Sequence, residues 1–394
     1  MIDPSIRRNI LLLAFCQGLL LSNGVTMIAV NGLVGRLLAP SELLATLTVT
    51  GYVIGAALTT LPAAYFMKRH GRRRGFMVGA LFGIAGGLIC ATAAHLGNFW
   101  LLCGGTLVAG GYNAFGLQYR FAAADMAPSD WKAKAISLTL AGGILGGFVG
   151  PALGNLTRNL WGVEFFATYA SLAGFAVLAL LIASRLQISD SAANQASADA
   201  PRTWRQIAGQ PAFMVAVLAA AIGYGTMNLL MAATPLAMDG CGFAFGDIAF
   251  VLQWHVVGMY APSFFTGNLI RRFGVHAILL VGAVLMLGCI GLAMSGLSLM
   301  HFWWALLLLG IGWNFLYIGG TTLLTETYRP AERAKVQGSN DFLVFAVQAV
   351  SSISAGALVL GQGWSTLNLY ALPGVLLIAL IVFSLLLRGR GKTT

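Results

Sequence analysis

The sequence predicts an all-α membrane protein with twelve transmembrane helices in two six-helix, pseudo-symmetric halves. Of its 394 residues, 58% are hydrophobic and only 9% are charged, whereas a soluble domain carries about 25% charged residues. Apolar runs long enough to cross a bilayer recur along the whole chain. Corresponding loops of the two halves also share a residue pattern. A soluble enzyme, a disordered chain and a disulfide-rich secreted domain are therefore excluded.

Twelve apolar segments account for the predicted helices. We expect the first six at 10–32, 42–67, 73–94, 99–122, 132–156 and 163–184. After a polar stretch, we expect the others at 211–234, 245–270, 275–295, 301–325, 334–360 and 366–387. Each must be a helix, because backbone groups in lipid have to be satisfied within their own segment. The predicted organisation is an N-terminal half at 1–184, a cytoplasmic linker at 185–210 and a C-terminal half at 211–394.

The basic residues predict how the chain is oriented. Of 23 Lys and Arg residues, all but Arg36 and Arg158 fall on the side of the membrane that carries the N-terminus. Because short loops rich in Lys and Arg stay in the cytoplasm, we expect both termini and the linker there. The net charge of +11 is then a topology signal, and we expect no nucleic-acid partner.

Internal repeats relate the two halves at an offset of about 201 to 203 residues. The second and eighth spans are followed by Lys68-Arg69-His70-Gly71 and Arg271-Arg272-Phe273-Gly274. The fourth and tenth spans contain Gly111-Tyr112-Asn113 and Gly312-Trp313-Asn314. Two copies of a six-helix unit related by an axis along the membrane normal form the architecture of major facilitator transporters, which this chain resembles.

The loop after the second span resembles the major facilitator signature G-x-x-x-D-[RK]-x-G-[RK]-[RK]. Lys68 stands where the signature has its aspartate, and Arg271 takes that position in the second half. The resemblance implies that the two loops latch a cytoplasmic gate through Arg69, Gly71, Arg72, Arg73, Arg271, Arg272 and Gly274. Since the aspartate is absent, Asp125 or Glu326 is the candidate to supply the acid.

Polar groups inside the spans are the next candidates for function, because an ionisable side chain at membrane depth is costly. Of 12 acidic residues, Asp341 alone lies well inside an apolar segment. Asn113 and Asn314 hold equivalent positions in the fourth and tenth spans. We interpret these three as cavity or coupling residues. No Walker motif, carboxylate pair or Ser/His/Asp set is present at this depth, so we expect no enzyme and no cofactor.

Two motifs in the seventh and eighth spans indicate a soft metal ion. Met227-x3-Met231 and His255-x3-Met259 each place two donors on one helix face. Met227 and His255 fall within about 5 Å of the same depth. Thioether sulfur and imidazole nitrogen suit copper, and thioethers select Cu(I). Cys241, at the outer mouth between the spans, would capture the ion first. Methionine is also a common gap filler in apolar cores, so ordinary packing is the alternative interpretation.

The paired motifs resemble those of CcoA-like major facilitator copper importers of bacteria. The resemblance implies copper uptake by alternating access across the cytoplasmic (inner) membrane, in support of cbb-type cytochrome c oxidase assembly. The copper ion would be the transported substrate, with the lipid bilayer and cytoplasmic copper chaperones as partners. We expect a monomer.

A transporter of an organic solute is the alternative function, either a riboflavin-like importer or a proton-coupled drug efflux protein. The same broader group is similar to riboflavin transporters, so membership alone does not fix the substrate. In this alternative the binding groups would be Tyr112, Asn113, Trp254, Trp313, Asn314 and Tyr317. A sensor or scaffold is less favoured, since no appended soluble domain is present.

Overall fold

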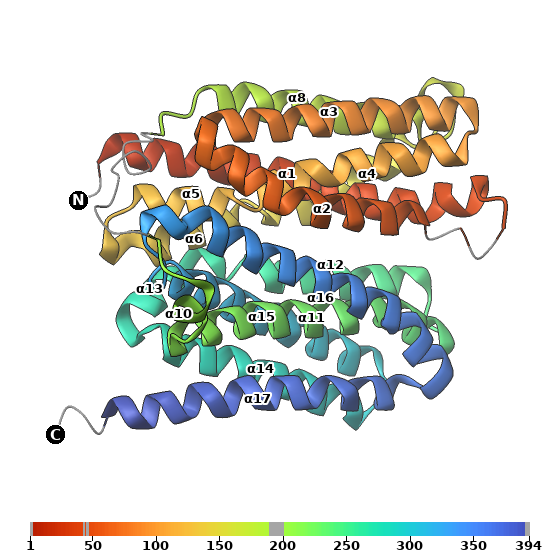
Figure 1. Ribbon diagram of the computed structural model, residues 1–394. Coiled ribbons are helices and arrows are strands. Elements are labelled where there is room, and N and C mark those ends of the chain that lie inside the picture. The colour runs from red at the N-terminus through yellow and green to blue at the C-terminus, as the bar shows by residue number, and fades with distance from the viewer. Residues whose placement is uncertain (1–2, 42–43, 45–46, 189–200, 391–394) are drawn as a thin grey trace. The chain divides into compact units, whose positions relative to one another are not determined.

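The computed structural model describes residues 3–41, 44, 47–188 and 201–390 (Figure 1). Within these ranges the ordered elements are helices and there is no strand. Among the described residues, ten helices are long and apolar enough to cross a membrane, or eleven if one bent pair counts as a single span. The prediction of an all-α membrane fold is confirmed.

Three of the predicted spans are interrupted in the structure. The span predicted at 99–122 is divided between α4 (Phe99–Gly116) and α5 (Tyr119–Met126), and neither is among the ten or eleven. The span at 132–156 breaks between α6 (Lys132–Ala141) and α7 (Ile144–Thr157). The span at 245–270 bends by 41° between α12 (Phe245–Tyr260) and α13 (Ser263–Phe273). Glycine or proline lies at each break, where it weakens or removes helical hydrogen bonding.

The chain divides into two compact units. The first comprises Met1–Met126, Gly142–Pro201 and Arg329–Phe345. Besides α4, α5 and α7, its helices are α1 (Pro4–Leu38), α2 (Leu47–His70), α3 (Arg72–Leu96), η3 (Leu160–Gly162), α8 (Phe166–Ser184), η4 (Pro330–Glu332) and the start of α16 (Arg333–Gln362). Within this unit α3 packs on α4 and α8, α2 packs on α4, and α1 packs on α7 and α8.

The second unit comprises Ala127–Ala141, Arg202–Tyr328 and Ala346–Thr394. Its further helices are η2 (Ser129–Trp131), α10 (Trp204–Ala208), α11 (Pro211–Gly240), α14 (Val275–Ser295), α15 (Leu299–Leu324) and α17 (Trp364–Arg390). Here α15 packs on α11, α12 and α14, and α6 packs on α13. The halves at 1–184 and 211–394 stay a prediction, and residues 189–200 of the predicted linker lie outside the described residues.

Backbones of α2 and α4 meet at two glycines in the first unit. A Cβ on Gly55 would overlap the carbonyl oxygen of Leu107, and a Cβ on Gly110 would overlap that of Tyr52. Only glycine allows so close a crossing of two membrane helices, because it carries no side chain.

The second unit repeats this crossing between α12 and α15. A Cβ on Gly258 would lie 2.8 Å from the carbonyl oxygen of Leu307, and one on Gly310 would lie 2.5 Å from that of His255. Gly258 follows Gly55 by 203 residues, within the offset read from the sequence, whereas Gly310 follows Gly110 by 200, one residue less than that offset. The two helix pairs therefore share one crossing geometry.

The two signature loops also share one backbone conformation. Gly71, between α2 and α3, has φ 86° and ψ 157°, and Gly274, between α13 and α14, has φ 85° and ψ 154°. Residues with side chains almost never adopt this region. Each glycine N–H closes the preceding helix, on Met67 O at 2.9 Å and on Ile270 O at 2.8 Å. Both glycines are thus required by the turn itself.

Candidate functional site

Four aromatic rings from three helices form a cluster in the second unit. Trp313 and Tyr317, one turn apart on α15, stack with their ring centroids 4.9 Å apart and their planes at 18°. Tyr224 of α11 meets both rings edge-on, at 5.2 and 5.1 Å. Tyr260 of α12 meets Trp313 at 5.6 Å. We call Tyr224, Tyr260, Trp313 and Tyr317 the aromatic cluster.

The aromatic cluster has an accessible member and a buried hydrogen-bond donor. Tyr224 is partly exposed, while the other three rings are buried. Trp313 is only 1% exposed, and its indole Nε1–H has no hydrogen-bond partner among the described residues. A buried donor without a partner is costly in the unliganded protein. A ligand that placed an acceptor next to the Trp313 Nε1–H would therefore form a hydrogen bond that the unliganded protein lacks.

The side-chain amide of Asn314, the residue after Trp313, makes its hydrogen bonds to other groups of the fold. Its Nδ2 donates to Met259 O at 2.7 Å and to Ser263 Oγ at 2.6 Å, and its Oδ1 accepts from Thr266 Oγ1 at 2.7 Å. These contacts join α15 to both sides of the break between α12 and α13. The amide therefore supports the bend and has no donor left for a substrate.

Asn113, the repeat counterpart of Asn314, lacks the side-chain hydrogen bonds that Asn314 makes. It lies on α4 in the first unit and is partly exposed, and no described protein group hydrogen-bonds to its side chain. The neighbouring Tyr112 is buried, with a hydroxyl that has no partner in the described structure. Of the two asparagines predicted to line a cavity, Asn113 is the one with a vacant amide.

His255 lies at the glycine crossing of α12 and α15 and is completely buried. Its Nδ1–H donates to Leu306 O at 2.8 Å, since a carbonyl oxygen can only accept. Its Nε2 has no hydrogen-bond partner among the described groups. One nitrogen is thus committed to holding two helices together, which is a structural use of the imidazole.

The other predicted metal ligands lie in dissimilar surroundings. Met227 and Met259 are buried, Met231 is partly exposed, and Cys241 is exposed where α11 ends. In the part of the chain that is described, no three His, Cys, Asp or Glu residues are grouped so that they could hold a metal ion. The packing interpretation of the methionines is consistent with this arrangement.

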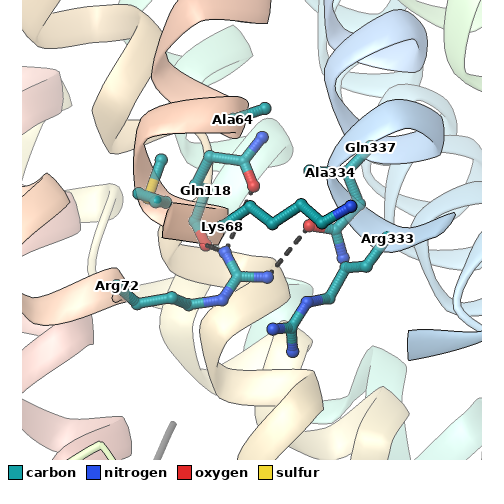
Figure 2. Close-up of a pocket in the computed structure, with 8 residues that line it drawn as sticks. Ala64, Lys68, Arg72, Gln118, Arg333, Ala334 and Gln337 are labelled. Atoms are coloured by element: carbon teal, nitrogen blue, oxygen red, sulfur yellow. Dashed lines mark hydrogen bonds between the residues drawn. The ribbon is translucent and has the colours of Figure 1, made fainter. Parts of the chain in front are cut away.

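A network of charges and amides forms in the first unit where α3, α5 and α16 meet. Asp125 Oδ2 accepts from Arg72 at 2.5 Å and from Arg333 at 3.1 Å. Arg72 also donates to Gln118 Oε1 at 3.2 Å and to Gln337 Oε1 at 2.9 Å (Figure 2). We call Arg72, Asp125 and Arg333 the outer charge group.

The predicted gating arginines differ in burial. Arg72 is buried in the network, whereas Arg69, Arg73, Arg271 and Arg272 are exposed. Lys68, at the position of the missing aspartate, donates to Ala331 O at 3.1 Å, just before α16. The acid paired with Arg72 is Asp125. Glu326 is exposed and forms no ion pair with a described residue.

Asp341 lies deeper in the same network, in an ion pair that the sequence did not reveal. Its Oδ1 accepts from Arg120 and from Asn340 Nδ2 at 3.2 Å, and its Oδ2 accepts from Gln118 Nε2 at 3.1 Å. Asp341 is 0% and Arg120 1% exposed. Arg120 counts among the cytoplasmic charges in the sequence, and its partner is 221 residues away along the chain.

A small pocket opens beside the network, lined by Ala64, Met67, Lys68, Arg72, Gln118, Arg333, Ala334 and Gln337 (Figure 2). Its volume of about 10 Å³ holds about one water molecule. It is therefore far too small to hold an organic substrate.

These observations define a class before any relative is considered: a polytopic helical membrane protein built from a repeat. The model of the Major Facilitator Superfamily matches residues 10–347. The chain belongs to this superfamily, whose members are transporters and not enzymes, and the multi-span fold implies an inner-membrane location.

Individual relatives are more specific than the match to the superfamily. The chain is 42% identical over 388 residues to the riboflavin transporter RfnT of Brucella anthropi, covering 98% of this chain and 97% of that one. It is 30% identical to YdeG, an uncharacterised transporter of the same superfamily from Bacillus subtilis, covering 94% and 89%. The human organic anion transporter MFSD10 superposes with a TM-score of 0.77 at 13% identity, covering 96% and 100%, which shows the fold alone.

The predicted copper import is wrong. The relative that is 42% identical over nearly the whole chain is a riboflavin transporter and not a CcoA-like copper importer. Nothing in the comparisons points to copper, to copper chaperones or to cytochrome c oxidase assembly. The physical reason for the error is visible at His255, where a histidine that joins two helices has the sequence appearance of a ligand.

Proposed function

We propose that this protein transports riboflavin across the inner membrane by alternating access of its two repeat-related halves. The observation that carries the proposal is the 42% identity to a riboflavin transporter over almost the full length of both chains. The match covers 98% of this chain and therefore includes the spans that would contact a substrate. It favours the organic-solute alternative of the sequence analysis.

The chemistry of the candidate groups supports a flavin. Riboflavin is uncharged at neutral pH, with a planar heteroaromatic ring system and a polyhydroxylated chain. A neutral substrate needs no carboxylate or ammonium partner in the spans, which agrees with a chain that is only 9% charged. Aromatic side chains stack on such ring systems at about 1–3 kcal/mol per ring.

Trp313, Tyr317 and Tyr224 are the groups we assign to the flavin ring. The partly exposed edge of Tyr224 offers access to the aromatic cluster, and Trp313 Nε1–H is a vacant donor for a ring carbonyl or nitrogen. In the first unit, the vacant amide of Asn113 is a separate candidate contact for a polar group of the substrate. Asn314 acts indirectly, by fixing the bend that positions Tyr260 and Trp313.

Orientation forms part of the proposal. With both termini in the cytoplasm, the loops of Arg69 to Arg74 and of Arg271 and Arg272 face inward. The outer charge group then lies at the cytoplasmic end of the first unit.

Uptake by living cells tests the proposed function. A riboflavin-auxotrophic bacterium without a transporter of its own would express this chain and receive labelled riboflavin at low concentration. We expect accumulation and growth that depend on the chain, with excess unlabelled riboflavin competing. A matched copper measurement in the same cells should show no dependence. Expression at the membrane without riboflavin accumulation would overturn the proposal.

A further inference from the structure

We propose that Gln348 and Ser352 of α16 bind the hydroxylated chain of the flavin, while the aromatic cluster binds its ring. This polar subsite rests on riboflavin being the substrate. It would make the chain of the flavin, as well as its ring, a determinant of recognition. All the residues concerned belong to the second unit.

Tyr224 of the aromatic cluster projects between α15 and α16. The residue before it, Gly223, faces α15, where an added Cβ would lie 3.2 Å from Leu316 Cβ. The residue after it, Gly225, faces α16, where an added Cβ would lie 2.6 Å from Val347 Cγ1. Because successive residues of a helix point about 100° apart, the Tyr224 side chain lies between these two directions. The accessible ring of the aromatic cluster is therefore beside the middle of α16.

Hydrogen bonds fix the register of α11 against α16. Asn228, four residues after Tyr224, donates from Nδ2 to Gln348 O at 3.1 Å and to Ser351 Oγ at 3.3 Å. Asn228 is 6% exposed, so these bonds are largely shielded from water. One helical turn is about 5.4 Å long, which places Gln348 about one turn beyond Tyr224. A substrate with a ring and an attached chain can span that distance.

Gln348 lies on the face of α16 that is turned away from lipid. Ser352 and Ala355, four and seven residues further on, share this face, and Ala355 is 1% exposed. Val350 and Ile353 point to the opposite side and are 66% and 69% exposed, which suits an apolar surface in contact with lipid. Polar side chains at membrane depth face the protein interior or a water-filled space. The positions of Gln348 and Ser352 agree with this rule.

The side chains of Gln348 and Ser352 lack protein partners. Gln348 is partly exposed and Ser352 is exposed, and no described residue hydrogen-bonds to either side chain. The neighbouring Ser354 differs, since its hydroxyl donates to Val350 O at 2.8 Å. A polar side chain near the middle of a membrane helix is costly. A ligand that supplies hydrogen bonds to these two groups would reduce that cost.

The two vacant groups match the chemistry of a hydroxylated chain. A glutamine amide offers two N–H donors and an acceptor oxygen, and a serine hydroxyl both donates and accepts. The hydroxyls of the substrate chain also donate and accept, so they can pair with Gln348 and Ser352 at once. Neither side chain is charged, which agrees with an uncharged substrate. The subsite would therefore favour a flavin that retains its chain over the ring alone.

Binding of two flavins to the purified full-length protein separates the chain from the ring. Lumiflavin carries the same ring as riboflavin, with a methyl group in place of the hydroxylated chain. Quenching of flavin fluorescence gives the dissociation constant of each. Two hydrogen bonds to the chain should make wild-type protein bind riboflavin about fourfold to a hundredfold more tightly than lumiflavin. Equal affinity for the two flavins would overturn the subsite.

Gln348→Met keeps the length of the side chain and removes its amide. It should bind riboflavin about two- to tenfold more weakly and lumiflavin as the wild type does, at an unchanged melting temperature. Ser352→Ala should have the same effect through a smaller change, and it tests the subsite even if Gln348→Met does not fold. Gln362→Met, at the exposed end of α16, is the matched control and should alter neither affinity.

Tyr224→Leu supplies the opposite pattern, because Tyr224 is assigned to the ring. It should weaken binding of both flavins by a similar factor. Wild-type protein that binds neither flavin would refute riboflavin as the substrate, and the subsite with it. Wild-type protein that binds riboflavin would refute the subsite alone if Gln348→Met and Ser352→Ala both keep the wild-type ratio of the two affinities.

Discussion

The backbone carbonyl of His255 lies against Gly310 just as that of Tyr52 lies against Gly110. His255 and Tyr52 are thus repeat counterparts at one kind of helix crossing, α12 on α15 and α2 on α4. At these positions the neighbouring helix is so close that the side chain is buried by the crossing. The place of His255 in the fold accounts for its burial without a metal ion.

Removal of the imidazole should therefore affect stability more than transport. In His255→Leu the hydrogen bond to Leu306 O is lost, at a cost of about 0.5–1.5 kcal/mol. We expect a lower melting temperature and riboflavin uptake near wild type per folded molecule. His301→Leu, which alters an exposed contact with Ser298, is the control. A stable His255→Leu protein without uptake would place the histidine in the substrate path instead.

The glycine crossing predicts a sharp position dependence for Gly→Ala changes. In Gly310→Ala the new Cβ would meet His255 O at 2.5 Å and Met259 N at 2.8 Å. Such overpacking costs about 1–3 kcal/mol. Gly291→Ala, on α14 with no atom within 4 Å of the new Cβ, should be neutral or slightly stabilising. Thermal unfolding in detergent measures both, and equal effects would contradict the crossing geometry.

Trp313 should contribute directly to flavin affinity. Trp313→Leu removes the stacked ring and the vacant Nε1 donor, and loss of stacking alone is worth about 1–3 kcal/mol. Binding measured by quenching of flavin fluorescence should weaken by about fivefold to more than a hundredfold. Trp313→Phe should recover part of the loss. Trp304→Leu, which removes a ring 49% exposed on the same helix, should bind normally, and equal losses in both tryptophan variants would refute the assignment.

The two repeat-related asparagines should respond oppositely to substitution. Asn113→Leu removes an amide without protein partners, so we expect weaker flavin binding at unchanged melting temperature. Asn314→Leu removes three buried hydrogen bonds and leaves their partners unsatisfied, which costs about 1–3 kcal/mol for each such group. The main effect of Asn314→Leu should therefore be a lower melting temperature. A destabilised Asn113→Leu protein with unchanged affinity would show that this amide supports the fold.

The fold was predictable because hydrophobicity and the positions of Lys and Arg are properties of the chain itself. The interruptions at 117–118, 142–143 and 261–262 were not predicted, since glycine and proline are tolerated inside many membrane helices. The signature marks the loop at Gly71 in the sequence, and the gating role it implies stays a prediction. Its backbone angles, matched at Gly274, add the physical reason for glycine there.

The candidate site was only partly predictable. Trp313 and Tyr317 carry a visible signal, two aromatic residues four apart beside Asn314. Tyr224 and Tyr260 join them only through the packing of α11 and α12 on α15, which no local pattern encodes. Likewise, Arg120 has the sequence appearance of another cytoplasmic charge. Its pairing with Asp341 depends on contacts between residues more than two hundred positions apart.

The central claim is tested most directly by counterflow in liposomes that contain the purified protein. Vesicles preloaded with unlabelled riboflavin are diluted into labelled riboflavin, with no ion gradient and with empty liposomes as the control. We expect transient accumulation of label that requires the protein and that falls in Trp313→Leu. Correctly inserted protein that exchanges no label would contradict riboflavin transport by this chain.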